Sequence, residues 1–190
     1  MRRDAQLAFS LIELLVVIAL LAILAPLAVG GPGRLTQDAR MAAALNDFHG
    51  ALELSRSHAI RSGQSTVICK SADGRRCTQS GDWDQGWLAF EDRNRDGNCI
   101  DADGDGRCDD DGGRIVLQGE GIQRWRLRLV ASGQYPRYRI RFEPSGLAPG
   151  HATTFSLCDL TGRHPPRGLV VSMLGRIRPA QEGDNHRCDR

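Results

Sequence analysis

The N-terminal sequence Ala8-Phe9-Ser10-Leu11-Ile12-Glu13 opens an apolar run that extends from Phe9 to Val29. Glu13 is the one charged residue within this run. An ionisable side chain inside a lipid core costs about 2.5–3.5 kcal/mol, so a protein retains it where another group pairs with it. The position of Glu13 therefore predicts a helix that packs among similar helices, and a chain whose function is assembly.

The same run sets the expected topology. Its length matches the roughly 20 apolar residues that span a bilayer. Arg2 and Arg3 precede it, which places the N-terminus in the cytoplasm and the remainder outside. An ordinary secretory signal peptide and a plain single-span anchor are the alternatives. Glu13 argues against the signal peptide, because a charge weakens the apolar core that such a signal needs.

The segment AFSLIELLVVIALLAIL resembles the class III signal of type IV prepilins and of the pseudopilins of type II secretion. The resemblance implies that residues 1–8 are a leader peptide and that a prepilin peptidase cleaves between Ala8 and Phe9 and methylates the new amine of Phe9. Ala8 stands where the family usually has Gly. Glu13 would neutralise the N-terminal amine of a neighbouring subunit, and such an opposite charge recovers the cost of burying the carboxylate.

A second helix is expected after the apolar run. The Gly/Pro cluster at 30–33 predicts a break, a helical pattern follows over 34–63, and Gly63 is suited to end it. The apolar residues of this pattern recur near a period of 3.6, which predicts one face packed against a sheet. They are Leu35, Ala39, Ala42, Leu45, Phe48, Leu52, Leu54 and Ile60.

Residues 64–190 read as short strands bounded by turn residues. Seven are expected, at 65–70, 86–91, 114–118, 124–130, 138–143, 153–159 and 168–173, and the fourth and fifth are expected to form a hairpin. One long helix followed by strands predicts an α+β fold with an antiparallel sheet.

Several patterns in this region are similar to the GspH/FimT family of minor pilins and pseudopilins. They are Val67-x-Cys69, Gly86-Trp87-Leu88-Ala89-Phe90, Arg141-Phe142-x-Pro144-x-Gly146 and Leu157-Cys158. The resemblance implies a pilin-like fold. Its long N-terminal helix would span the membrane over residues 9–29 and pack its amphipathic half, 34–63, on a periplasmic β domain, 64–190.

Six cysteines follow the apolar run. An even number in a domain outside the cytoplasm predicts disulfides. Fifteen pairings are open, and proximity in the sequence favours Cys69–Cys77, Cys99–Cys108 and Cys158–Cys188. No C-x-x-C spacing or accompanying His cluster indicates zinc.

The sequence Gly175-Arg176-Ile177-Arg178 follows the last predicted strand. Arginines two apart on an extended backbone point to one side, and a preceding Gly lets the backbone approach a ligand. Two such guanidinium groups suit successive phosphates. The motif resembles the C-terminal Gly-Arg-x-Arg of FimT minor pilins, which bind DNA during natural transformation, and this implies that Gly175, Arg176 and Arg178 contact double-stranded DNA. The alternative is a surface turn whose arginines pair with Asp184 or Asp189.

Two further sets of arginines alternate with apolar residues in the predicted hairpin. They are Arg124, Arg126 and Arg128, and Arg137, Arg139 and Arg141. Alternation with a period of two places each set on one face, and pairing of the two strands would join six guanidinium groups on one solvent face. Like charges across strands destabilise a sheet, so a counter-charge is required. Nucleic acid and the chain's own acidic loop are the two candidates.

That acidic loop, residues 91–111, holds nine acidic and three basic side chains. Asp92, Asn94, Asp96 and Asp103 follow the spacing of an EF-hand loop, with Asp in place of the final Glu. No flanking helices are indicated, so the pattern predicts a Ca²⁺ loop between strands. The alternatives are a solvated loop and a partner for the arginines. No cofactor is required for the expected function, and Ca²⁺ is the candidate ligand.

The five histidines form no recognisable Ser/His/Asp or metal-ligand arrangement, which argues against an enzyme. The expected function is a FimT-like minor pilin that contacts DNA. Its partners would be other pilins or pseudopilins and the prepilin peptidase. The inner membrane would hold the subunit before it joins the filament. A GspH-type pseudopilin of type II secretion is the first alternative. A membrane-anchored calcium-binding or adhesive domain, independent of cleavage at Phe9, is the second.

Overall fold

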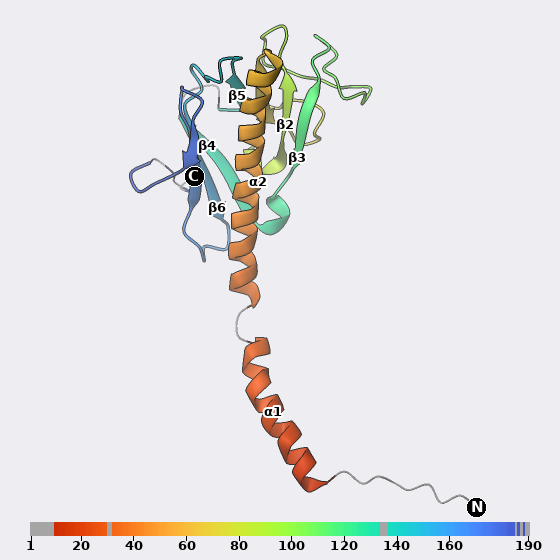
Figure 1. Cartoon of the computed structure of the whole chain (residues 1–190), viewed down its shortest axis with the longest axis vertical. Coiled ribbons are helices and arrows are strands. Elements are labelled where there is room, and N and C mark those ends of the chain that lie inside the picture. Colours follow the sequence, from red (N-terminus) through yellow and green to blue (C-terminus); the bar gives the residue numbers. More distant parts are fainter. Residues whose placement is uncertain (1–9, 30–31, 134–136, 185, 187, 189–190) are drawn as a thin grey trace, which may run out of the picture. The chain divides into compact units, whose positions relative to one another are not determined.

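The computed structural model describes residues 10–29, 32–133, 137–184, 186 and 188, and within these ranges it describes the side chains of residues 10–22 and of residue 36 onward. The backbone divides into two units, Met1–Gln37 and Asp38–Arg190. Figure 1 labels the elements.

The N-terminal unit contains helix α1, Leu11–Val29. Its side chains from Leu11 to Ala22 are exposed, and those of Leu11 and Ile12 have 76% and 69% of their area in contact with solvent. Among the helical residues that the structure describes, none forms a stretch long and apolar enough to cross a membrane. The predicted span, 9–29, includes side chains outside the described part, and it stays a prediction.

Helix α2, Pro32–Ser62, begins shortly after α1 ends, with residues 30 and 31 outside the described part of the chain. The Gly/Pro cluster therefore lies where one helix gives way to the next, as the sequence predicts. At the other end Gly63 adopts a φ of 67° and donates its N–H to the carbonyl of Ala59. This left-handed residue ends the helix because a Gly has no Cβ to resist that conformation.

The buried face of α2 carries Met41, Ala44, Phe48, Leu52 and Ala59, which join the main core. Three edge-to-face contacts tie the Phe48 ring to the β domain, at centroid distances of 5.5, 4.9 and 4.7 Å from Trp83, Trp87 and Phe155. The expectation that Leu54 and Ile60 belong to this face is wrong. They are 42% and 49% exposed, because the short residues Ala51, Ser55 and Ala59 occupy the contact instead.

The strands form two antiparallel four-stranded sheets. One has the order β3-β2-β1-β5 and is built from Ile115–Glu120, Gly86–Glu91, Thr66–Lys70 and Arg139–Phe142. The other has the order β4-β6-β7-β8 and is built from Leu127–Gly133, Thr153–Asp159, Arg167–Val171 and Ile177–Pro179. Two short 3-10 helices, Trp83–Gln85 and Gln123–Trp125, lie before β2 and β4. In Figure 1, α2 runs along both sheets, and its buried side chains share one core with them.

The predicted α+β fold is confirmed, with two differences. The structure adds β8, which is only three residues long and therefore leaves a weak pattern in the sequence. The predicted hairpin of 124–130 with 138–143 is wrong, because β4 pairs with β6 while β5 pairs with β1. Period-two alternation specifies which side chains face the core, and it does not specify the neighbouring strand.

The two central strands of the first sheet are buried on both faces. All residues of β1 and β2 are buried. On the side away from α2, Val67, Cys69, Leu88 and Phe90 pack against Cys99 and Cys108 of the acidic loop in a second, smaller core. The loop thus covers one face of the sheet.

The cysteines pair as sequence proximity favours. Cys69–Cys77, Cys99–Cys108 and Cys158–Cys188 are disulfide-bonded, with Cα–Cα distances of 5.6, 5.0 and 5.7 Å. Two of these bonds fix the loops over the first sheet. The third joins β6 to the C-terminal segment.

Candidate functional site

The Gly175–Arg178 motif begins in the tight turn that joins β7 to β8. Gly175 donates its N–H to the carbonyl of Ser172 at 2.9 Å, and the N–H of Ser172 donates to the carbonyl of Arg176 at 3.0 Å. Gly175 has a φ of 73°. A three-residue loop that ends in a left-handed residue is a common hairpin connection, and Gly is the residue that fits this position.

Gly175 is also required by a close approach of two backbone segments. A Cβ at this position would collide with the carbonyl oxygen of Gly146, in the loop after β5. The same oxygen accepts a hydrogen bond from Nε of Arg56, a residue of α2, at 3.0 Å. The β7–β8 turn therefore packs against the loop after β5, and Arg56 of α2 binds that loop. Gly146 and Gly175, which belong to separate sequence motifs, lie against each other.

Arg176 and Arg178 flank the buried Ile177, with Arg176 in the turn before β8 and Arg178 within the strand. Their surroundings differ. Arg176 is exposed, and among the described residues no carboxylate pairs with it. Arg178 donates to both carboxylate oxygens of Asp184, at 2.6 and 2.9 Å. This contact raises the pKa of Arg178 and lowers that of Asp184. The surface-turn alternative is thus realised for Arg178, while Asp189 lies outside the described residues.

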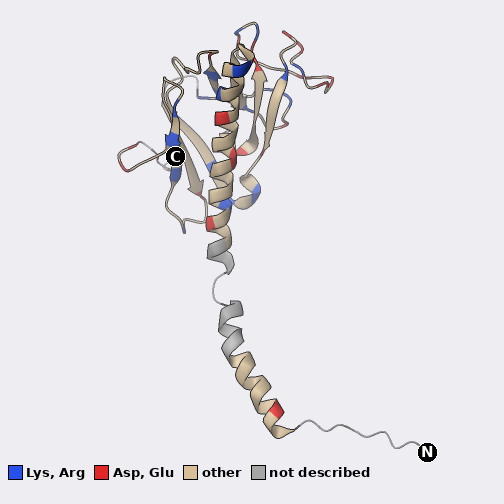
Figure 2. Cartoon of the chain, viewed as in Figure 1, with Lys and Arg blue, Asp and Glu red and all other residues tan. Residues whose placement is uncertain are grey.

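The expected face of six arginines does not form, because β4 and β5 lie in different sheets. Arg124 and Arg126 are not in a strand at all. Arg124 belongs to a 3-10 helix, and Arg126 follows it with a φ of 57°. Figure 2 accordingly shows basic and acidic residues interspersed over the loops of the β domain.

Within the described part of the chain, the side chain of each predicted arginine but Arg126 has a hydrogen-bond partner. On the first set, Arg124 pairs with Glu120 at 2.9 Å and Arg128 with Asp82 at 2.8 Å. Arg137 donates to the carbonyl of Gly133 at 3.3 Å. Carboxylates pair with Arg124, Arg128 and Arg141, so local acidic groups neutralise half of what the sequence suggests is a continuous basic surface.

The acidic loop lies against the two arginines of β5 and provides their hydrogen-bond partners. Arg141 donates from Nε to Asp92 at 2.9 Å, and a terminal nitrogen forms an ion pair with the same oxygen at 2.9 Å. Asp92 is 1% exposed. Arg139 donates to the carbonyls of Asp96 and Gly97 at 2.6 and 2.8 Å. The sequence offers nucleic acid and the chain's own acidic loop as partners for these arginines. In the structure, the acidic loop binds Arg139 and Arg141.

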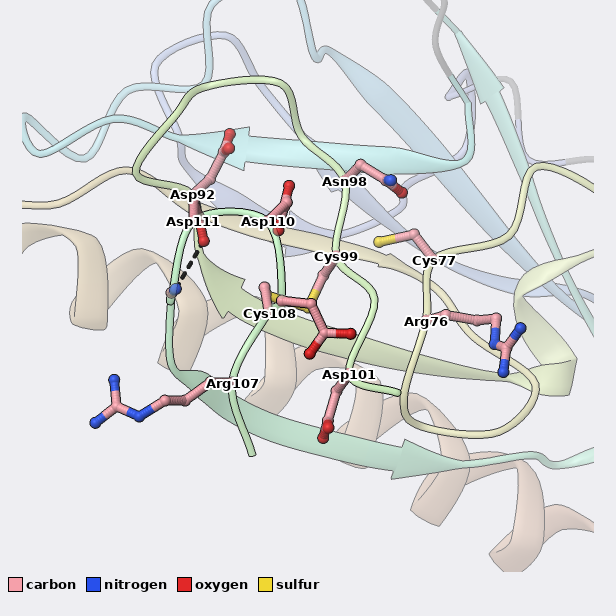
Figure 3. The surroundings of a disulfide bond; sticks show 12 residues. Arg76, Cys77, Asp92, Asn98, Cys99, Asp101, Arg107, Cys108, Asp110 and Asp111 are labelled. Carbon is pink, nitrogen blue, oxygen red and sulfur yellow. Dashed lines mark hydrogen bonds between the residues drawn. A yellow bond between two sulfur atoms is a disulfide. The ribbon is translucent and has the colours of Figure 1, made fainter. Parts of the chain in front are cut away.

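The predicted metal ligands are not gathered as a set. Both oxygens of Asp92 are engaged, one by Arg141 and the other by the N–H of Gly97 at 3.1 Å. Among the described residues Asp103 instead has an oxygen within 4.8 Å of those of Asp101 and Asp109. Asp101 is 3% exposed and accepts the N–H groups of Gly104 and Gly106. Figure 3 shows Asp101, Asp110 and Asp111 around the Cys99–Cys108 disulfide. Binding of Ca²⁺ here stays a prediction.

The N-terminal assembly residues are described only in part. Ala8 and Phe9, the predicted cleavage site, lie outside the described residues. Glu13 lies in the first turn of α1 and is exposed. A carboxylate at a helix N-terminus is favoured by the helix dipole, and in a single chain its side chain remains accessible to a neighbouring subunit.

The sequence does not single out Arg56, and it leaves the partner of Arg178 open between two residues. Arg56 carries no local motif, since an Arg on a helix is ordinary. It gains its role because Gly146 and Gly175 approach each other beside it. Asp184 was named as one of two possible partners, and only the turn at 181–184 brings it to Arg178: the N–H of Gln181 donates to the same carboxylate at 2.7 Å.

Comparison with known proteins assigns both parts of the chain. A family model described as type II transport protein GspH matches residues 44–175, and a model of the prokaryotic N-terminal methylation motif matches residues 3–25. No curated protein is a significant sequence match.

Two kinds of solved structure align with the chain, and the first shares its fold. The type IV minor pilin FimU of Pseudomonas aeruginosa aligns with a TM-score of 0.57 and 18% identity, over 79% of this chain and 95% of FimU. The minor pseudopilin EpsH of the Vibrio cholerae type 2 secretion system aligns with a TM-score of 0.46 and 16% identity, over 76% of this chain and 99% of EpsH.

Proposed function

Because this chain belongs to the family of the type II transport protein GspH, we propose that it is a minor subunit of a type IV pilus that contacts double-stranded DNA at Gly175–Arg178. The family and the N-terminal methylation motif make it a pilin-type structural subunit of a type IV pilus or type II secretion filament, and not an enzyme. Family membership also argues against a stand-alone adhesive domain. What is proposed beyond family membership is that the filament is a type IV pilus and that the ligand is double-stranded DNA.

The observation that carries the DNA contact is the exposure of Arg176 on a rigid turn. The turn is closed by its own hydrogen bonds and packs against Gly146, and Arg56 binds the carbonyl of Gly146. Because the backbone is already fixed, only the Arg176 side chain has to be ordered when it binds a phosphate. Arg178 is bound to Asp184, so a phosphate must compete with that carboxylate for it. Binding through so few phosphates is expected to be weak and steeply dependent on salt.

The test is binding of the full-length protein, in a mild nonionic detergent, to a fluorescent 30-base-pair duplex at low salt. Arg176→Ala is expected to weaken binding about tenfold, which corresponds to about 1.4 kcal/mol. Asp184→Asn is expected to strengthen it, because the variant releases Arg178. Arg163→Ala is the matched control, since Arg163 is also exposed. Binding that is absent in the natural protein, or equal in all four proteins, would refute the DNA contact.

Insertion into the filament is proposed to depend on α1. Cleavage between Ala8 and Phe9, methylation of Phe9 and pairing of Glu13 with the amine of an adjacent subunit would bury its exposed apolar surface among other helices. The inner membrane would hold the subunit beforehand through the predicted span, 9–29, with the β domain in the periplasm. Mass spectrometry of protein from the native host should find methylated Phe9 as the first residue. Glu13→Gln should leave cleavage unchanged and reduce incorporation, because the amide carries no counter-charge.

A role in type II secretion is the second candidate, and the description of the matching family model favours it. Deletion of the gene distinguishes the two. Loss of DNA uptake with normal protein export supports the pilus proposal, and loss of export with normal DNA uptake supports a pseudopilin.

A further inference from the structure

The tip of the β7–β8 hairpin exposes two large apolar residues. Met173 is 52% exposed and Leu174 is 71% exposed. Among the described residues of the unit Asp38–Arg190, no large apolar side chain is more exposed than Leu174. An isolated exposed Leu needs no explanation, but two in succession at the end of a hairpin form a small protruding apolar surface.

This tip is rigid. Besides the two hydrogen bonds that close the turn, the carbonyl of Met173 accepts the N–H of Ala148 at 2.9 Å. The loop after β5 is folded on itself by a hydrogen bond from the N–H of Gly146 to the carbonyl of Glu143 at 2.7 Å. Met173 and Leu174 are therefore presented from a fixed backbone.

The tip is flanked by cations from two separate elements. Arg176 follows it directly and is exposed. Arg56 reaches it from α2, and its Nε would lie 3.0 Å from a Cβ on Gly175. Arg56 is half-buried and uses Nε to hold Gly146, so its terminal nitrogens remain as donors. Two arginines therefore lie beside Gly175, at the base of the apolar tip. Such an arrangement fits a ligand that is anionic on its surface and apolar beneath it.

We propose that this tip is a wedge for the DNA minor groove: Leu174, supported by Met173, inserts at a base step, and Arg176 and Arg56 contact phosphates next to it. The inference rests on the proposed DNA contact and adds its mode. Proteins that use the minor groove combine Arg contacts with Leu, Ile or Met wedges that partly unstack a base step and bend the duplex. Pyrimidine–purine steps unstack most easily, so a TA step should be preferred.

The test uses the full-length protein and a 30-base-pair duplex with 2-aminopurine at a central TA step, whose fluorescence rises when the base unstacks. A donor and an acceptor dye at the duplex ends report bending. The natural protein is expected to raise the 2-aminopurine signal about twofold or more and to bring the ends closer. Leu174→Ser should remove both signals while reducing affinity less than tenfold, because the phosphate contacts remain. Leu160→Ser is the matched control, since Leu160 is 56% exposed elsewhere on the domain.

The outcomes separate the wedge from the DNA contact itself. Binding that depends on Arg176 but gives no unstacking overturns the wedge and leaves the DNA contact in place. Unstacking that persists in both Leu174→Ser and Met173→Ser also overturns the wedge. If Leu174→Ser blocks association with other pilins and leaves DNA binding and bending unchanged, the tip is a protein interface and the inference is wrong. Absence of any DNA binding at low salt overturns both proposals.

Discussion

Replacement of Phe48 by Ala is expected to be the most damaging single change to the attachment of α2. Phe48 is fully buried, and its ring meets Trp83, Trp87 and Phe155 edge to face. Truncation of a buried Phe to Ala costs about 3–5 kcal/mol. Each aromatic pair adds about 0.5–1.5 kcal/mol beyond area burial, which places the loss near the upper end, at about 4–5 kcal/mol.

The loss is large relative to the total stability of a domain, about 5–15 kcal/mol. Unfolding of the disulfide-intact protein in urea, followed by tryptophan fluorescence, measures it. With a urea dependence of about 2 kcal/mol per molar, the midpoint should fall by about 2 M. Leu54→Ala on the same helix is the control: Leu54 is 42% exposed, and the change should cost about 1 kcal/mol. If Phe48→Ala costs no more than Leu54→Ala, the aromatic cluster does not hold the helix, and the reasoning fails.

Three further expectations follow from the loops. Arg141→Ala should destabilise the domain by about 3–5 kcal/mol in urea unfolding because it leaves the buried Asp92 unpaired, and adding Asp92→Asn should restore part of the loss. Burial would raise the pKa of Asp159, but hydrogen bonds from Thr161 and His164 outweigh it and hold the pKa well below its usual range. Asp159 thus adds stability above about pH 4 that is lost on acidification, so Asp159→Asn should cost about 1–2 kcal/mol at pH 7 and progressively less in unfolding measured toward pH 2. If the acidic loop binds Ca²⁺, millimolar CaCl₂ should raise the melting temperature and Asp103→Asn should remove the increase; no change in calorimetry would contradict the metal prediction.

The errors of the sequence-based prediction come from partners that are distant along the chain. Alternation identified β4 and β5 as strands, and it carried no information on which neighbour each would take. The pairing of β5 with β1 separates the six arginines and places Arg139 and Arg141 against the acidic loop. Leu54 and Ile60 were misassigned because their spacing suits a helix face, whereas Ala44, Ala51 and Ala59 let the sheets approach the helix more closely on another side.

The sequence by itself determined the features that depend on neighbouring residues. A lone Glu within an apolar run, a Gly that ends a helix, cysteines close enough to pair and a Gly before two arginines each act through local backbone and side-chain chemistry. The tertiary structure decided which charges are neutralised and what supports the candidate site. Asp184 reaches Arg178, and Arg56 reaches Gly146 beside Gly175, because packing of α2 and the two sheets brings together segments that no local pattern connects.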